Sequence, residues 1–74
     1  MKYYIVMENA VIDTAYSIKQ AREQAETWSK VWRRWCNIWT QTTMKGAYDD
    51  GRKVDMHGKL NRQQLEIMRE YLHK

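Results

Sequence analysis

The 74-residue sequence has no proline, no phenylalanine, one cysteine and three glycines. It has no apolar run of the roughly 18 residues or more that a transmembrane helix needs, so we expect no such helix. A helix lying on a membrane surface is disfavoured by Glu23 and Glu26 and by the strands predicted on either side, so no membrane partner is expected. A single cysteine cannot form an internal disulfide, which excludes a disulfide scaffold and favours the reducing cytoplasm. A chain of this length has room for one domain, residues 1–74.

Aliphatic residues are also scarce, because Leu, Ile and Val together number only 12. Such a low content is typical of disordered chains. Five tyrosines and four tryptophans oppose that interpretation, since each aromatic side chain can bury roughly 150–250 Å². We therefore predict a small ordered core built around Trp and Tyr.

Charge is unevenly distributed along the chain. The formal net charge is +4, but residues 1–27 sum to −1 and residues 28–74 to +5. The basic excess begins where the tryptophans begin. This distribution allows nucleic acid or an acidic protein surface as a partner, and it equally allows a basic surface that only maintains solubility.

The N-terminal segment predicts a β-hairpin. Lys2–Met7 is rich in aromatic and β-branched residues and apolar on both faces, which favours a central strand. A turn at Glu8–Ala10 and a second strand over Val11–Tyr16 complete the hairpin. Ser17 followed by Gln20 matches a helix capping box.

A long amphipathic helix is expected to follow, from Ile18 to between Cys36 and Gln41. At about 100° per residue, the four tryptophans fall within an arc of about 60°. Ala21 and Ala25 share this stripe, whereas the charged residues lie on the opposite side. The tryptophans are Trp28, Trp32, Trp35 and Trp39.

The rest of the chain predicts an irregular or hairpin segment and a C-terminal helix. Asp50-Gly51 is a type I′ turn signal, with candidate strands near Ile38–Tyr48 and Arg52–Met56, although a basic loop is an equal alternative. Asn61 and Gln64 predict a helix start, with an apolar stripe of Leu65, Met68 and Leu72. The predicted fold class is α+β.

The tryptophan stripe has two interpretations. It can be core alone, packed on the hairpin and covered by the C-terminal stripe. Alternatively, because a helix ending at Trp39 would be longer than a strand, its last part would overhang the sheet and need a partner or a second copy as cover. A monomer is slightly favoured over a homodimer.

The sequence offers no catalytic constellation, so we expect a protein that is not an enzyme. It contains two histidines and one thiol without a zinc-ligand spacing, and its glycines form no phosphate-binding motif. Cys36 lies at the edge of the tryptophan stripe, where a buried, unreactive thiol is expected. Neither a cofactor nor a metal is predicted.

Trp, Tyr, Met and Arg are enriched at protein interfaces, so a protein partner is the favoured hypothesis. The candidate partner-binding residues are Trp32, Arg33, Arg34, Trp35 and Trp39. The alternative is a small basic nucleic-acid-binding protein using Lys30, Arg33, Arg34, Lys45, Arg52 and Lys53. On one helix Arg and Trp would point to opposite sides, which disfavours this alternative.

The order of elements resembles that of small phage-encoded accessory proteins, which take over a host machine or counter host defences. The resemblance covers the segments Lys2–Met7, Val11–Ser17 and the Ala21/Ala25 helix, and rests on organisation alone. It implies an inhibitor or regulator that binds a host machine, in the host cytoplasm if the protein is viral. No functional residue can be assigned from it.

Overall fold

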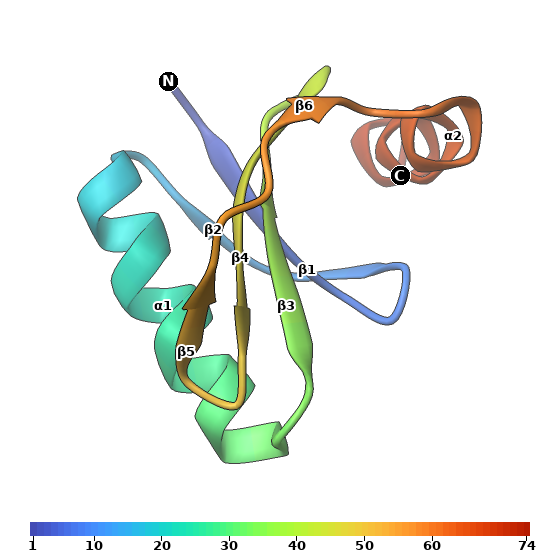
Figure 1. The fold of residues 1–74 in the computed structure, drawn as a ribbon. Coiled ribbons are helices and arrows are strands. Elements are labelled where there is room, and N and C mark those ends of the chain that lie inside the picture. The colour runs from blue at the N-terminus through green and yellow to red at the C-terminus, as the bar shows by residue number, and fades with distance from the viewer.

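One antiparallel sheet with a helix on each face makes up the protein (Figure 1). The fold is described from a computed structural model that covers residues 1–74. The strands are ordered β2-β1-β3-β4-β5, and β6 also pairs with β4. The elements are β1 (Tyr3–Met7), β2 (Ala10–Ala15), α1 (Ile18–Trp32), β3 (Trp35–Trp39), β4 (Thr43–Asp49), β5 (Arg52–Val54), β6 (Gly58–Lys59) and α2 (Arg62–Leu72). The α+β class and the N-terminal hairpin followed by a helix are confirmed.

Both predicted turns form. Glu8 and Asn9 have φ values of 49° and 64°, and Asp50 and Gly51 have 49° and 82°. Positive φ at both central residues is the type I′ geometry that matches the twist of paired strands. Two tight hairpins, β1–β2 and β4–β5, follow from these turns.

The first helix begins where the sequence predicts. The Ser17 hydroxyl accepts a hydrogen bond from the Gln20 N–H at 3.1 Å. The Gln20 side chain, however, accepts from the Tyr16 N–H at 3.2 Å instead of returning to Ser17. Only half of the predicted capping box is therefore present, and it is enough to satisfy an amide of the first turn.

The predicted end of this helix is wrong. Helix α1 ends at Trp32, and Arg33 adopts the left-handed conformation with φ of 52°. The N–H groups of Arg33 and Arg34 both donate to the Ser29 carbonyl, which closes the helix. The chain then reverses into β3, so Trp35 and Trp39 lie on a strand, and β3 replaces the first part of the strand expected over Ile38–Tyr48.

The two faces of the sheet hold separate apolar clusters, because alternate residues of a strand point to opposite sides. Ile5 and Ile38 face α1, whose small Ala21 and Ala25 allow close packing. Tyr4 and Trp39 face α2. The α1 cluster contains Ile5, Met7, Ala15, Ala21, Ala25, Cys36, Ile38 and Tyr48, and the α2 cluster contains Tyr4, Val6, Trp39, Leu60 and Met68.

The second helix begins as predicted but buries a different face. Asn61 and Gln64 form both hydrogen bonds of a capping box, at 2.8 and 2.9 Å. Met68 is buried, whereas Leu65 and Leu72 are exposed, and Ile67 and Tyr71 pack beside Met68 instead. The predicted stripe is thus right only at Met68. Neither helix is both long and apolar enough to cross a membrane.

Candidate functional site

The junction between α1 and β3 carries most of the predicted partner-binding residues. Trp32 ends α1 and is 56% exposed, and Trp35 begins β3 and is 40% exposed. Arg33 and Arg34 form the connection between them. We call Trp32, Arg33, Arg34 and Trp35 the corner surface. Four consecutive residues of a tight chain reversal thus present two indoles and two guanidinium groups together.

An ion pair joins the corner surface to the β1–β2 turn. The Arg34 guanidinium contacts the Glu8 carboxylate, and both side chains are more than half exposed. Such an exposed pair contributes at most about 1 kcal/mol to stability. The ion pair places the β1–β2 turn next to the corner surface.

An apolar groove lies on the α1 side of this ion pair. The groove has a volume of about 490 Å³ and is lined by Met7, Ala10, Ile12, Trp28 and Trp32, with Glu8 and Arg34 at its rim. A cavity with apolar walls and a few charged groups at its edge suits a side chain of a partner. We refer to it as the apolar groove.

Asp13 fixes the indole that forms one wall of this groove. Its carboxylate accepts hydrogen bonds from Trp28 Nε1 at 3.0 Å, from the Gln24 amide and from the Thr14 N–H. Burial acts to raise the pKa of Asp13, but these three hydrogen bonds outweigh it and hold the pKa below its usual value. Asp13 is therefore a charged positioning residue for Trp28, a role that the sequence analysis missed.

A second, polar groove lies on the other side of the ion pair. It measures about 460 Å³ and is lined by Glu8, Asn9, Arg33, Arg34, Trp35, Asn37 and Asp49. Trp35 Nε1 donates to Asn37 Oδ1 at 2.6 Å, so the indole is held over the strand. The corner surface thus separates an apolar groove from a polar one.

Trp39 does not belong to this site. It is 1% exposed and packs in the α2 cluster, with its Nε1 left without a hydrogen-bond partner. The prediction that Trp39 offers a binding surface fails because the residue lies on a central strand rather than at the end of a helix. Trp28, the first tryptophan of the predicted stripe, is half-buried: it packs against the α1 cluster and also lines the apolar groove.

The predicted nucleic-acid set is not gathered on one face. Lys30 is paired with Glu26 at 3.3 Å, and Arg34 with Glu8. In the strand register Trp35, Asp49 and Arg52 are neighbours, whereas Lys53 pairs with Tyr48 and so points to the opposite face. Lys45 falls at the bulge where the β3–β4 register shifts.

The single thiol is enclosed in the core. Cys36 is fully buried in the α1 cluster, and this burial raises the pKa of its thiol to about 11. A thiol in this state is uncharged at neutral pH, so it is a poor nucleophile. No three His, Cys, Asp or Glu side chains lie close enough together to hold a metal ion.

Comparison with protein-family models, curated proteins and solved structures finds no match to this chain. The corner surface, its two grooves and the β1–β2 turn are therefore the basis on which a function can be argued.

Proposed function

We propose that the protein is a non-enzymatic interaction module that binds a protein partner through the corner surface and the apolar groove, as an inhibitor or regulator would. The observation that carries the proposal is the pair of half-exposed indoles, Trp32 and Trp35, on either side of the Arg34–Glu8 ion pair. Trp and Arg are the residues most often found as energetic anchors at protein interfaces.

Trp32 is the expected anchor because its side chain is exposed and also lines the apolar groove. Truncating an anchor of this kind costs about 2 kcal/mol or more in binding free energy. That cost corresponds to an affinity about 30-fold weaker. Since Trp32 is mostly exposed, its removal should change the stability of the fold much less.

Affinity capture with matched variants tests the proposal. The tagged protein, Trp32→Ala and Tyr16→Ala are compared for the proteins that each retains from cells in which the chain is expressed. Tyr16 is 72% exposed and precedes the opposite end of α1, so it controls for loss of any exposed aromatic residue. We expect partners to be kept by Tyr16→Ala and lost by Trp32→Ala, with both variants folded by circular dichroism. Equal retention by both variants would refute the role of the corner surface.

Nucleic-acid binding is a second candidate, supported by one observation. Trp35 and Arg52 lie in one row across β3, β4 and β5, so an indole and a cation share a sheet face. Stacking and phosphate contacts can then be made on the same side, although Asp49 lies between them. Binding of this kind weakens steeply with salt through counterion release, which a titration of a single-stranded oligonucleotide at several salt concentrations measures.

A further inference from the structure

We infer that the polar groove binds a guanine nucleotide, with the base on Trp35 and Asp49 and the phosphate on Arg33. The groove shares Trp35 and Arg33 with the corner surface, but the expected protein-binding anchor, Trp32, does not line it. The site is therefore additional to the proposed protein-binding function. Three groups in the groove define the ligand: an exposed indole, a carboxylate and a guanidinium group.

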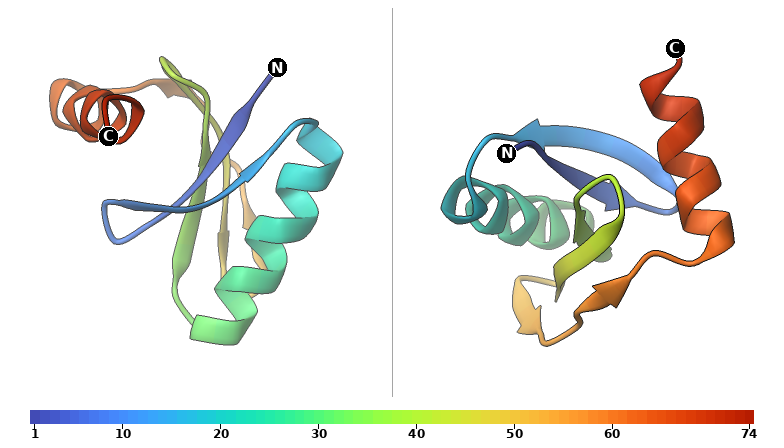
Figure 2. Two further views of the ribbon diagram at one scale, coloured as in Figure 1. Left: turned by 180° about the vertical axis from the view of Figure 1, so that it is seen from behind. Right: turned by 90° about the horizontal axis from the view of Figure 1, so that it is seen from above.

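One wall of the groove is a part of the sheet that no helix covers. Trp35 and Asn37 lie on the same face of β3 as Trp39, because alternate residues of a strand share a face. Helix α2 covers only the Trp39 end of this face, and the α1–β3 junction lies at the other end of the strand (Figure 2). Glu8 and Asn9 of the β1–β2 turn complete the groove. Its volume of about 460 Å³ falls in the range of roughly 300–1,000 Å³ that is typical of small-molecule sites.

The indole of Trp35 offers a planar surface for an aromatic ring. It is 40% exposed, and its Nε1 donates to Asn37 Oδ1 at 2.6 Å, so the ring is held in place without a ligand. Because the indole N–H is already bonded, the ring surface is what remains for a ligand to contact. Nucleobases stack on exposed aromatic side chains of this kind.

The charges around the groove exclude a cationic ligand. The Glu8 carboxylate contacts Arg34, so these two charges offset each other. Asp49 and Arg33 form no ion pair, either with each other or elsewhere in the fold. Arg52 is the neighbour of Asp49 in the strand register, so three arginines lie near this carboxylate and oppose a second positive charge there. The ligand must therefore bring uncharged donors to Asp49 and negative charge to Arg33.

The separation of Arg33 from Asp49 restricts the ligand further. Since the two side chains are not within ion-pair distance, a ligand that contacts both must carry its anion apart from its donors. A free amino acid carries its carboxylate and its amino group on one carbon atom and does not meet this requirement. A nucleotide meets it, because its phosphate is on the sugar and its donors are on the far edge of the base.

Guanine is the base whose edge complements a carboxylate. Its N1–H and 2-amino group are adjacent donors, which the two oxygens of one carboxylate can accept together. On the same edge, adenine and cytosine have an acceptor nitrogen beside the amino group, and uracil has a carbonyl on each side of its N–H. The free amide NH₂ of Asn37 can donate to guanine O6, since Asn37 lies diagonally across from Asp49 in the β3–β4 pair and lines the same groove.

Calorimetric titration of the intact protein with nucleotides tests the inference. We expect guanosine 5′-monophosphate to bind and to shift the indole N–H resonance of Trp35. Inosine 5′-monophosphate lacks only the 2-amino group, so it should bind about tenfold more weakly. Adenosine 5′-monophosphate should bind more weakly still. No binding, or equal affinities for the guanine and adenine nucleotides, would overturn the inference.

Asp49→Asn and Asp50→Asn are matched variants, because they remove the same charge from adjacent exposed residues and only Asp49 lines the groove. An amide offers one acceptor and one donor, which complements xanthine, since xanthine carries an oxygen where guanine carries its 2-amino group. We expect Asp49→Asn to bind guanosine 5′-monophosphate about tenfold more weakly and to prefer xanthosine 5′-monophosphate. Asp50→Asn should keep the preference for guanine. The same preference in both folded variants would refute the role of Asp49.

Arg33→Ala tests the contact with the phosphate. The intact protein should bind guanosine 5′-monophosphate more tightly than guanosine, because the guanidinium forms charge-assisted hydrogen bonds with phosphate oxygens. The variant should bind the two ligands with nearly equal affinities. A phosphate advantage that survives in Arg33→Ala would contradict the role assigned to Arg33.

Short single strands that begin with a 5′-phosphorylated guanosine identify the source of the ligand. Tighter binding of such a strand than of guanosine 5′-monophosphate would assign the site to the end of a nucleic acid, and weaker binding would assign it to the free nucleotide. In either case a strand that begins with adenosine should bind more weakly than its guanosine counterpart. Equal binding of the two strands and of the two mononucleotides would show that the groove does not recognise guanine.

Discussion

At the scale of single residues, Arg33 combines an unfavourable conformation with an exposed position. It adopts a φ of 52° at the end of α1, where glycine is the residue that carries no steric penalty. No carboxylate lies within ion-pair distance of its guanidinium, although the neighbouring Arg34 is paired. Arg33 thus strains the backbone and forms no ion pair within the fold, so binding a partner is the role that we propose for its side chain.

We therefore expect Arg33→Gly to raise stability and weaken partner binding at the same time. Relief of the left-handed conformation should increase the free energy of unfolding by about 1 kcal/mol, measured in urea. Loss of the guanidinium should reduce the amount of partner captured. Arg33→Ala is the control, since it removes the charge but keeps the strained Cβ and should leave stability nearly unchanged. Weaker binding with no gain in stability would contradict the conformational argument.

Individual side chains of the site were predictable from the sequence to different degrees. The prediction that Trp32, Arg34 and Trp35 are partner candidates rested on their residue types and on their place near the end of the expected helix, although that helix in fact ends at Trp32. Asp13 and Ser29 were missed, because a polar residue in a strand or helix gives no signal that it will accept a hydrogen bond from a particular distant donor. Ser29 is fully buried, and its Oγ accepts from the Gly51 N–H at 2.8 Å, a contact between segments 22 positions apart.

At the scale of elements, the stretch Trp32–Trp39 fits two periodicities. Tryptophans at 28, 32, 35 and 39 share one face of a helix, but Cys36 and Ile38 alternate with Trp35, Asn37 and Trp39 as a strand requires. The sequence has no glycine or asparagine at the end of this helix, so the residues around Arg33 give no signal that the helix ends there. Pairing of β3 between β1 and β4 decides in favour of the strand.

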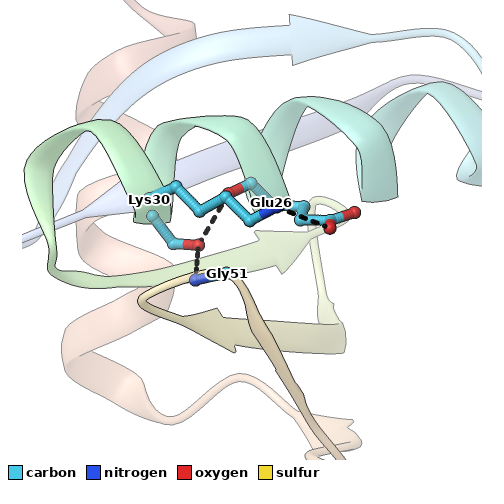
Figure 3. A network of polar contacts seen from close by, with 4 residues as sticks. Glu26, Lys30 and Gly51 are labelled. Carbon is cyan, nitrogen blue, oxygen red and sulfur yellow. Dashed lines mark hydrogen bonds and ion pairs between the residues drawn. The ribbon is translucent and has the colours of Figure 1, made fainter.

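The β4–β5 turn is fastened to α1 by a polar contact that can be tested. The Ser29 hydroxyl donates to the Glu26 carbonyl at 2.9 Å and accepts from the Gly51 N–H (Figure 3). The Lys30 side chain runs beside Gly51, with its amine 3.3 Å from Glu26 Oε1. Gly51 also has a φ of 82°, so both its backbone and its surroundings favour the absence of a Cβ.

We expect Gly51→Ala to lower the free energy of unfolding by about 1–2 kcal/mol, mainly through the positive φ. The added Cβ would also lie 2.4 Å from Lys30 Cγ and Cε, so the lysine side chain must shift. Each kcal/mol should lower the melting temperature by roughly 4–8 °C in a domain of this size. Gly46→Ala is the matched control, because a Cβ at Gly46 meets no atom within 4 Å. Equal melting temperatures for the two variants would contradict this account.

At the scale of the whole molecule, the sheet separates two clusters of unequal extent. The α1 cluster unites eight buried residues from β1, β2, α1, β3 and β4. Helix α2, by contrast, contributes a single fully buried side chain, Met68, to the other cluster. The Tyr4–Tyr71 ring contact, with centroids 5.7 Å apart, supplements it. A helix attached by so few buried groups is expected to open separately from the rest of the fold.

Met68→Ala tests this order of stability. Removing a buried Met side chain costs about 2–5 kcal/mol, and most of that cost should fall on the docking of α2. Hydrogen exchange should then show α2 amides losing protection while the amides of α1 and β3 keep most of theirs. Met56→Ala provides the control, because Met56 is 37% exposed on the segment between β5 and β6 and should leave both patterns unchanged. Loss of protection in α1 and α2 together would show instead that both faces of the sheet unfold as one unit. In the expected case Trp39, which packs with Met68, is uncovered when α2 opens.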